Sequence, residues 1–301
     1  MLAPVVLFVY NRLEHTIDVL ESLSKNLLAK DTELFVFSDA AKSEKGLEKV
    51  NEVREYINRK NWQSSFQSVT IIQAEKNKGL ANSVIDGVSE IIEKYGKVIA
   101  VEDDLILSPY FLKYMNGALD YYQNDSQIWS ISGYSFPMKC LQRYSHDVFY
   151  SYRGCSWGWA TWSDRWQTVD WEARDYYKMR DDEKWIERFN RGGVDLADML
   201  TMQMEGKIDS WAIRWCFSQS NQEKYTVYPK NSYLQNSGCD GTGTHSGNND
   251  KFHTNINDCV LECKYESLGI EKRLAKEFQK KYKDTISDKV KRKLKKLFRV
   301  K

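Results

Sequence analysis

Three consecutive acids, Glu102-Asp103-Asp104, follow an apolar segment at residues 98–101. A continuous apolar run of this kind predicts a strand that is buried on both faces. Carboxylates this close repel one another by on the order of a few kcal/mol in a partly dry site unless a cation compensates them. Their oxygens suit Mn²⁺ or Mg²⁺, which keep open positions for substrate phosphates. The sequence therefore predicts a metal and diphosphate site here, with a solvated acidic turn as the alternative.

The elements that must position these acids alternate along the first hundred residues. Strand-like runs occur at residues 4–10, 34–37, 68–73 and 98–101. Helical spacing of apolar residues occurs between them, at residues 13–28, 47–57 and from about 80 onward. This alternation predicts an α/β fold with a mainly parallel, mixed sheet flanked by helices. Ligands of such sheets lie beyond the carboxyl ends of the strands, where the polar clusters of this chain fall.

The pattern is less regular beyond Pro109. We predict a helix at 110–122, a strand at 128–133, and helices at 181–190 and 194–204. Five tryptophans fall within fifteen residues, namely Trp157, Trp159, Trp162, Trp166 and Trp171. Aromatic faces suit the apolar face of a sugar ring, but most of these rings are expected in the core. We expect one or two, Trp157 or Trp159, at a sugar site.

The charge of the chain is concentrated at its end. Residues 287–301 carry eight lysines or arginines and one acid, Asp288. Ile286, Val290, Leu294 and Leu297 share one helical face, so residues 286–301 predict a basic amphipathic helix that binds an anionic membrane surface. A solvated helix or a frayed terminus is the alternative. The rest of the chain is mildly acidic, which disfavours nucleic-acid binding.

The N-terminus shows no sign of export. It has no basic region, and its apolar run Val5–Val9 is too short to cross a bilayer. The six cysteines contain no Cys-x-x-Cys pair, so a disulfide scaffold is not indicated. We expect a cytoplasmic protein at the inner face of the plasma membrane.

The acid cluster belongs to a longer pattern. The strand, Glu-Asp-Asp, Leu105 and Ser108-Pro109-Tyr110-Phe111 together resemble the metal motif of the eukaryotic N-acetylglucosaminyltransferase I family, inverting glycosyltransferases of the GT-A fold. Further segments resemble that family in the same order, namely Val9-Tyr10-Asn11-Arg12, Phe37-Ser38-Asp39, Gly154-Cys155-Ser156-Trp157-Gly158-Trp159, Asp209-Ser210-Trp211 and Gly243-Thr244-His245-Ser246-Gly247. The likeness covers roughly residues 3–250.

The resemblance implies a role for each matching residue. Arg12 and Asp39 would contact uracil and ribose, with Lys78 as a further nucleotide contact. Glu102 and Asp103 would contact the donor sugar and ribose, and Asp104 would ligate Mn²⁺ or Mg²⁺. Asp209 would be the general base, although an N-cap role at a following helix is the alternative. Trp211 would lie at the acceptor, and the segment with Thr244 and His245 would close over the phosphates.

The resemblance also implies a domain plan. Residues 1–250 would form the catalytic domain, with a nucleotide-sugar half at 1–105 and an acceptor half at 106–250, followed by a helical extension at 251–301. The eukaryotic members carry an anchor and a stem before the first strand, so we expect a bacterial relative. Its substrates would be a UDP-sugar and a lipid-linked glycan acceptor, in synthesis of a surface polysaccharide.

Two other functions stay open. A sugar-1-phosphate nucleotidyltransferase shares the alternating fold and an acid-bound metal, but Tyr10-Asn11-Arg12-Leu13 lacks the glycine-rich loop that such enzymes use for a triphosphate. An inactive carbohydrate-binding protein of the same fold is the second, because fold alone does not decide activity.

Overall fold

The computed structural model describes residues 1–59, 61–238, 252–259 and 262–283. Its strands are β1 Val5–Val9, β2 Glu33–Ser38, β3 Ser68–Gln73, β4 Lys97–Glu102, β5 Leu105–Leu107, β6 Ile128–Ser132, β7 Val148–Ser151, β8 Trp159–Trp162, β9 Tyr225–Pro229 and β10 Leu234–Asn236. Its α-helices are α1 Leu13–Ser24, α2 Leu47–Arg59, α3 Leu80–Tyr95, α4 Phe111–Tyr122, α5 Ser163–Trp166, α6 Tyr176–Met179, α7 Glu183–Phe189, α8 Leu196–Met204, α9 Trp211–Asn221 and α10 Lys272–Lys281.

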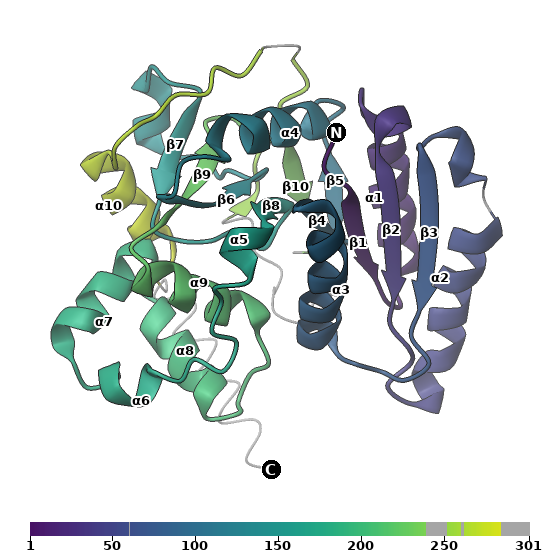
Figure 1. Ribbon diagram of the computed structural model, residues 1–301, viewed down its shortest axis with the longest axis horizontal. Coiled ribbons are helices and arrows are strands. Elements are labelled where there is room, and N and C mark those ends of the chain that lie inside the picture. The colour runs from purple at the N-terminus through teal and green to yellow at the C-terminus, as the bar shows by residue number, and fades with distance from the viewer. Residues whose placement is uncertain (60, 239–251, 260–261, 284–301) are drawn as a thin grey trace.

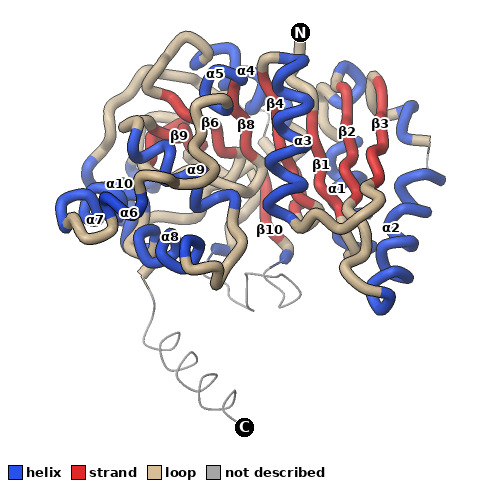
Figure 2. The backbone as a smooth tube through the Cα atoms, turned by 60° about the horizontal axis from the view of Figure 1, so that its bottom comes forward, coloured by secondary structure: helices blue, strands red, loops and turns tan. Residues whose placement is uncertain are grey.

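One large sheet runs through the molecule in the order β3-β2-β1-β4-β8-β6-β9-β7, and β10 pairs separately with β5. Figure 2 shows this order across the width of the chain, with α3 in front of the sheet. Strands β3, β2, β1 and β4 are parallel, as are β6 and β9, whereas β8 and β7 run antiparallel to their neighbours. The predicted α/β fold with a mainly parallel, mixed sheet is confirmed.

Both faces of the sheet are covered, which explains the continuous apolar runs of its central strands. Along β1, Val5, Leu7 and Val9 pack into a core that includes α1, α2 and α4. Val6 and Phe8 point the other way, into a second core with α3 and α9. Figure 1 shows α3 on the opposite side of the sheet from α1. The carboxyl ends of β1, β2 and β4 therefore emerge side by side at one edge between two packed layers.

Several predicted elements needed correction. The helix predicted at 13–28 ends at Ser24, and the short strands β5, β7, β8, β9 and β10 and the helix α9 were not predicted. Among the described residues from 252 to 283, only α10 is an α-helix, so this part is less helical than expected. Phe278 of α10 packs against Phe136, with ring centroids 4.9 Å apart. No helix in the described ranges is long and apolar enough to cross a membrane, and the predicted helix at 286–301 lies outside them.

The tryptophan-rich segment enters the sheet through a tight glycine turn before β8. Gly158 has a positive φ of 54°, and its carbonyl accepts a 2.7 Å hydrogen bond from the amide of Gly133. A Cβ at Gly158 would lie 2.2 Å from Cδ2 of Leu234 in β10. The turn therefore needs glycine for its backbone conformation and for its contact with β10.

We predict that Gly158→Ala lowers the free energy of unfolding by about 2–4 kcal/mol, because left-handed backbone strain and overpacking against Leu234 both act. Urea denaturation would measure the change. Gly206→Ala is the matched control, since Gly206 also has a positive φ, 69°, but has nothing within 4 Å of its Cβ position. Equal losses in the two variants would contradict the packing role of Gly158.

Candidate functional site

Arg12 binds two of the three acids directly. Strands β1 and β4 are neighbours with Phe8 opposite Glu102, so the residues that follow the two strands meet at one edge. The guanidinium of Arg12 donates to both carboxylate oxygens of Asp103 and to Oδ2 of Asp104, the last at 3.1 Å. Asp103 and Asp104 are 5% and 8% exposed. The charge compensation expected from a metal is thus supplied in part by the protein itself.

The acids of this cluster outnumber the positive charge that Arg12 supplies. Burial, followed by the charges of Asp104 and Asp103, raises the pKa of Glu102 well above its usual range. Burial also raises the pKa of Asp103, and its contact with Arg12 opposes part of that rise. Burial alone lowers the pKa of Arg12, but the two carboxylates outweigh it and raise that pKa. One guanidinium faces three acids, so this edge of the sheet favours additional positive charge.

A short segment after β10 covers Asp104. Asn236 Nδ2 donates to Asp104 Oδ1 at 3.3 Å, and the amide of Ser237 donates to the Asp104 carbonyl at 2.8 Å. A Cβ at Gly238 would lie 2.4 Å from Asp104 Oδ2, so the backbone approaches the carboxylate as closely as only glycine permits. Thr244 and His245 lie outside the described residues.

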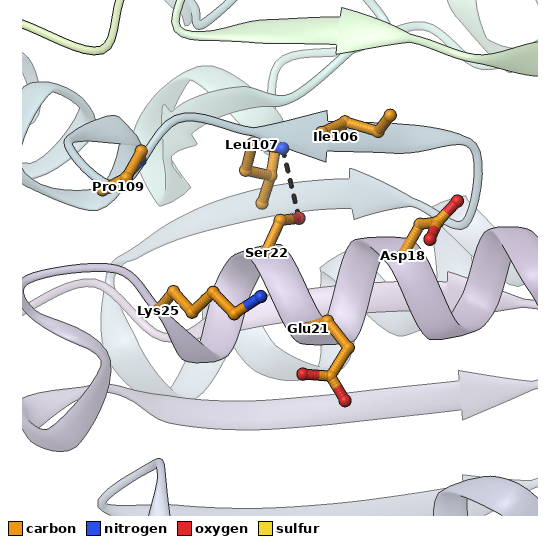
Figure 3. Close-up of a pocket in the computed structure, with 7 residues that line it drawn as sticks. All are labelled: Asp18, Glu21, Ser22, Lys25, Ile106, Leu107 and Pro109. Carbon is orange, nitrogen blue, oxygen red and sulfur yellow. Dashed lines mark hydrogen bonds between the residues drawn. The ribbon is translucent and has the colours of Figure 1, made fainter.

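Strand β5, which directly follows the acids, is anchored to α1. Figure 3 shows the groove between them, where the amide of Leu107 donates to Ser22 Oγ at 3.2 Å. The groove has a volume of about 280 Å³ and carries Asp18, Glu21 and Lys25 on its α1 side. Helix α1 begins directly after Arg12. The same helix therefore positions both the Arg12 guanidinium and strand β5.

Asp39, after β2, organises the turn that leads into α3. Its carboxylate accepts hydrogen bonds from the amides of Ala40, Lys78 and Gly79 and from Asn77 Nδ2, at 2.8–3.0 Å. These four donors fill the usual acceptor sites of a carboxylate. The predicted nucleotide contact of Asp39 is untested, and the structure shows its side chain supporting the turn. The Lys78 ammonium pairs with Asp86 on α3 at 2.8 Å.

Asp209 lies across from this turn, in the loop before α9. The N-cap of α9 is Ser210, whose Oγ accepts from the amide of Ile213 at 3.3 Å, so the N-cap alternative for Asp209 is wrong. The Asp209 side chain is 64% exposed, and its Oδ1 lies 3.6 Å from Nη2 of Arg214. Its Oδ2 lies 3.9 Å from the Cβ position of Gly79. An accessible carboxylate therefore faces the turn that Asp39 holds.

The tryptophans divide into core and surface. Trp159 and Trp211 are 1% and 3% exposed and pack together with ring centroids 5.0 Å apart. Both rings are packed inside the core, and the sugar contact predicted for Trp159 and the acceptor contact predicted for Trp211 stay untested. Trp157 is only partly buried and meets Tyr134 and Phe252 edge to face. It stays a candidate for sugar stacking.

The residues around Asp104 fit a divalent cation only with help from a substrate. Among the described residues, no group of three or more His, Cys, Asp or Glu side chains is arranged to hold a metal. Mg²⁺ and related ions are, however, often bound by one or two carboxylates together with substrate phosphates and water. Asp104, buried beside a cluster short of positive charge, suits that mode of binding.

Several residues of this site were not predicted from the sequence. Asn236, Gly238 and Arg214 contact Asp104 or Asp209, and none of them was predicted as a site residue. Asn77, whose Nδ2 donates to Asp39, was not predicted either. Asparagine and glycine are common turn residues. Their occurrence near a strand end therefore predicts a turn and does not indicate a contact with an acid.

Comparisons with known proteins give matches among solved structures only. No model of a known protein family matches the sequence, and no curated protein does. A structure of S. aureus TarS aligns with 17% identity and a TM-score of 0.33, over 44% of this chain and 21% of that one. TarS 1–349 aligns with 13% identity and a TM-score of 0.43, over 78% and 60% of the two chains.

A third structure is that of the mannosyltransferase PcManGT from Pyrobaculum calidifontis in complex with GDP-Man and Mn²⁺. It aligns with 10% identity and a TM-score of 0.40, over 73% of this chain and 69% of that one. The present chain therefore spans about a fifth of one TarS chain and 60% of the other.

We predict that Arg12→Gln lowers the free energy of unfolding by about 3–5 kcal/mol, because it leaves Asp103 and Asp104 buried without their cation. Urea denaturation at neutral pH would measure the change. Arg59→Gln is the control, since Arg59 and Glu55 form an exposed pair at 2.9 Å whose loss should cost less than about 1 kcal/mol. A loss at Arg12 no larger than that at Arg59 would contradict the compensating role.

Proposed function

We propose that this chain is a GT-A-type, metal-assisted glycosyltransferase, specifically a hexosyltransferase or N-acetylhexosaminyltransferase. It moves a sugar from a UDP-sugar to a hydroxyl of a lipid-linked glycan, with inversion, in the assembly of a bacterial capsule or O-antigen. One observation carries the proposal. An accessible acid, Asp209, faces the same sheet edge as a buried cluster of acids that is short of positive charge.

The two sides of this edge suit opposite parts of the reaction. Asp209 is exposed, so an acceptor hydroxyl can approach it, and its carboxylate can accept the proton that the hydroxyl loses on attack. The Arg214 guanidinium lies 3.6 Å from Asp209 Oδ1 and is itself largely buried, so it leaves the outer side of the carboxylate open. Asp209 would then act as the general base.

The donor would occupy the other side. Arg12 lies between the β1 and β4 ends and can share its guanidinium between the acids and the diphosphate. Glu102 and Asp103 would accept hydrogen bonds from ribose and sugar hydroxyls. The turn held by Asp39 would border the nucleotide. A Mn²⁺ or Mg²⁺ ion on Asp104 would act as a Lewis acid that stabilises the departing UDP.

We predict that the purified chain releases UDP from one UDP-sugar in a panel, in the presence of Mn²⁺ and an acceptor glycan, and that EDTA abolishes the release. Asp104→Asn should remove metal-dependent turnover, whereas Asp209→Asn should lower the turnover rate by about 100-fold or more while donor binding is retained. Coupled UDP detection and calorimetric titration of UDP-sugar would measure the two effects.

The exposed acid Asp198 on α8 supplies a control, and Asp198→Asn should behave as the parent does. Release of diphosphate in place of UDP would establish the nucleotidyltransferase alternative. Neither UDP release nor nucleotide binding, with acceptor present, would establish the inactive carbohydrate-binding alternative. Loss of UDP-sugar binding in Asp209→Asn would contradict its role as the base.

We also propose that residues 286–301 bind the anionic inner surface of the plasma membrane, which would bring the enzyme to a lipid-linked acceptor. The support is sequence alone, namely the basic residues and the apolar positions of that segment. Each basic residue near the headgroups contributes about 1 kcal/mol.

Deletion of residues 286–301 should release the protein from vesicles that contain phosphatidylglycerol, as measured by co-sedimentation, and leave transfer to a soluble acceptor unchanged. Pure phosphatidylcholine vesicles are the control, because they lack the negative charge that attracts the segment. Equal sedimentation of the full and shortened chains would overturn the membrane role.

A further inference from the structure

A cavity of about 300 Å³ lies against α4, away from the acids. The N-cap residue Tyr110 and one face of α4, with Lys113 and Tyr114, form one side. The opposing walls include Tyr233 and Tyr265. The cavity lies near the amino end of β1, because Asn116 of α4 accepts a 2.8 Å hydrogen bond from the amide of Ala3. Arg12 follows the carboxyl end of the same strand, so the cavity is separate from the proposed catalytic site.

The aromatic walls are built closely. Tyr114 and Tyr233 stack with ring centroids 4.5 Å apart and planes 14° from parallel. Tyr265 crosses α4 at Gly117, where a Cβ would lie 2.5 Å from the Tyr265 hydroxyl. That hydroxyl donates to the carbonyl of Tyr114 at 2.9 Å. Gly117 thus allows Tyr265 to lie flat against the helix and complete the wall.

Polar groups surround these rings. Lys113 Nζ and Glu262 Oε1 are 3.9 Å apart and are 46% and 90% exposed. That separation is too long for a hydrogen bond, so both groups can turn toward a ligand at little cost. The buried hydroxyl of Tyr114 has no hydrogen-bond partner within the described chain, which leaves a donor in the wall unsatisfied.

We propose that this cavity binds one pyranose ring of a carbohydrate. The volume lies at the lower end of the range for ligand pockets, which suits a single ring better than a nucleotide. Tyr114 and Tyr233 are 2% and 4% exposed and only back the wall. The half-buried rings of Tyr110 and Tyr265 are the ones that can pack against the apolar face of a sugar. The exposed ammonium and carboxylate offer donors and acceptors to its hydroxyls. An acyl chain would leave these polar groups unused, and a phosphate would meet the Glu262 carboxylate beside the one ammonium.

The cavity and the acids lie at opposite ends of the short strand β10, so one glycan chain can reach both. Tyr233 immediately precedes β10, and Asn236 at the other end of β10 binds Asp104. A strand of three residues spans about 10 Å. The sugar would therefore bind at one end of the β5 and β10 pair, while Asp104 lies at the other. The proposal itself does not depend on the catalytic assignment.

Saturation-transfer NMR with the full chain and methyl glycosides of glucose, galactose, mannose and N-acetylglucosamine tests this inference. We expect transfer to at least one glycoside, unchanged by excess UDP-sugar and in Asp209→Asn. Gly117→Ala should weaken binding about tenfold, because the added methyl displaces Tyr265 while favouring the helix. Tyr110→Ala should weaken it as well, and Tyr177→Ala, at a tyrosine 61% exposed elsewhere, should not.

Circular dichroism and thermal melting of each variant establish that it is folded, and Lys113→Ala replaces Gly117→Ala if that variant is not. Transfer to none of the glycosides would overturn the proposal. So would equal transfer in the cavity variants and the parent, or displacement of the glycoside by UDP-sugar, which would place the sugar at the donor site. Binding of phenol or octanoate at the cavity, with no glycoside bound, would overturn the choice of ligand class.

Discussion

The structure depends on burying Asp103 and Asp104 at the end of a central strand, where they are 5% and 8% exposed. Removing two adjacent carboxylates from water costs several kcal/mol each unless a cation meets them at close range. Arg12 meets both, and it can do so because β1 and β4 are parallel neighbours in the sheet. The charge compensation of the candidate site therefore depends on the strand order. A different neighbour for β4 would leave Asp103 and Asp104 without the Arg12 guanidinium.

The rest of the site divides into a rigid side and an accessible side around this interaction. Asp104 is held by Arg12, by Asn236 and by the close backbone of Gly238, and β5 after it is fixed to α1. Among the described residues, Asp209 forms an ion pair with Arg214 alone, and its side chain is 64% exposed. Compensation of buried charge requires exclusion of water, whereas a base must be reached by its substrate. The difference in burial between Asp104 and Asp209 fits the roles proposed for them.

The sequence predicted the first half of the fold better than the second. Long apolar runs and helical spacing located β1 to β4 and α1 to α3, and β3 has the predicted bounds Ser68–Gln73. Strands β5 and β10 have three residues each and pair across more than a hundred positions, so no local period reveals them. The site follows the same division. Residue types at strand ends indicated chemistry, but the pairing of Arg12 with Asp103, 91 positions away, and the burial of Trp159 required the fold.

The charge balance of the cluster also links the proposed metal to the proposed donor. Arg12 supplies one positive charge to three acids, and burial together with the charges of Asp104 and Asp103 raises the pKa of Glu102. A divalent cation alone would relieve that deficit but would leave most of its own coordination positions to water, because Asp104 offers few oxygens that Arg12 and Asn236 do not already contact. A diphosphate alone would add negative charge to an acidic edge. Each lowers the cost of binding the other, so the geometry favours their binding together, with Arg12 shared between the acids and the phosphates.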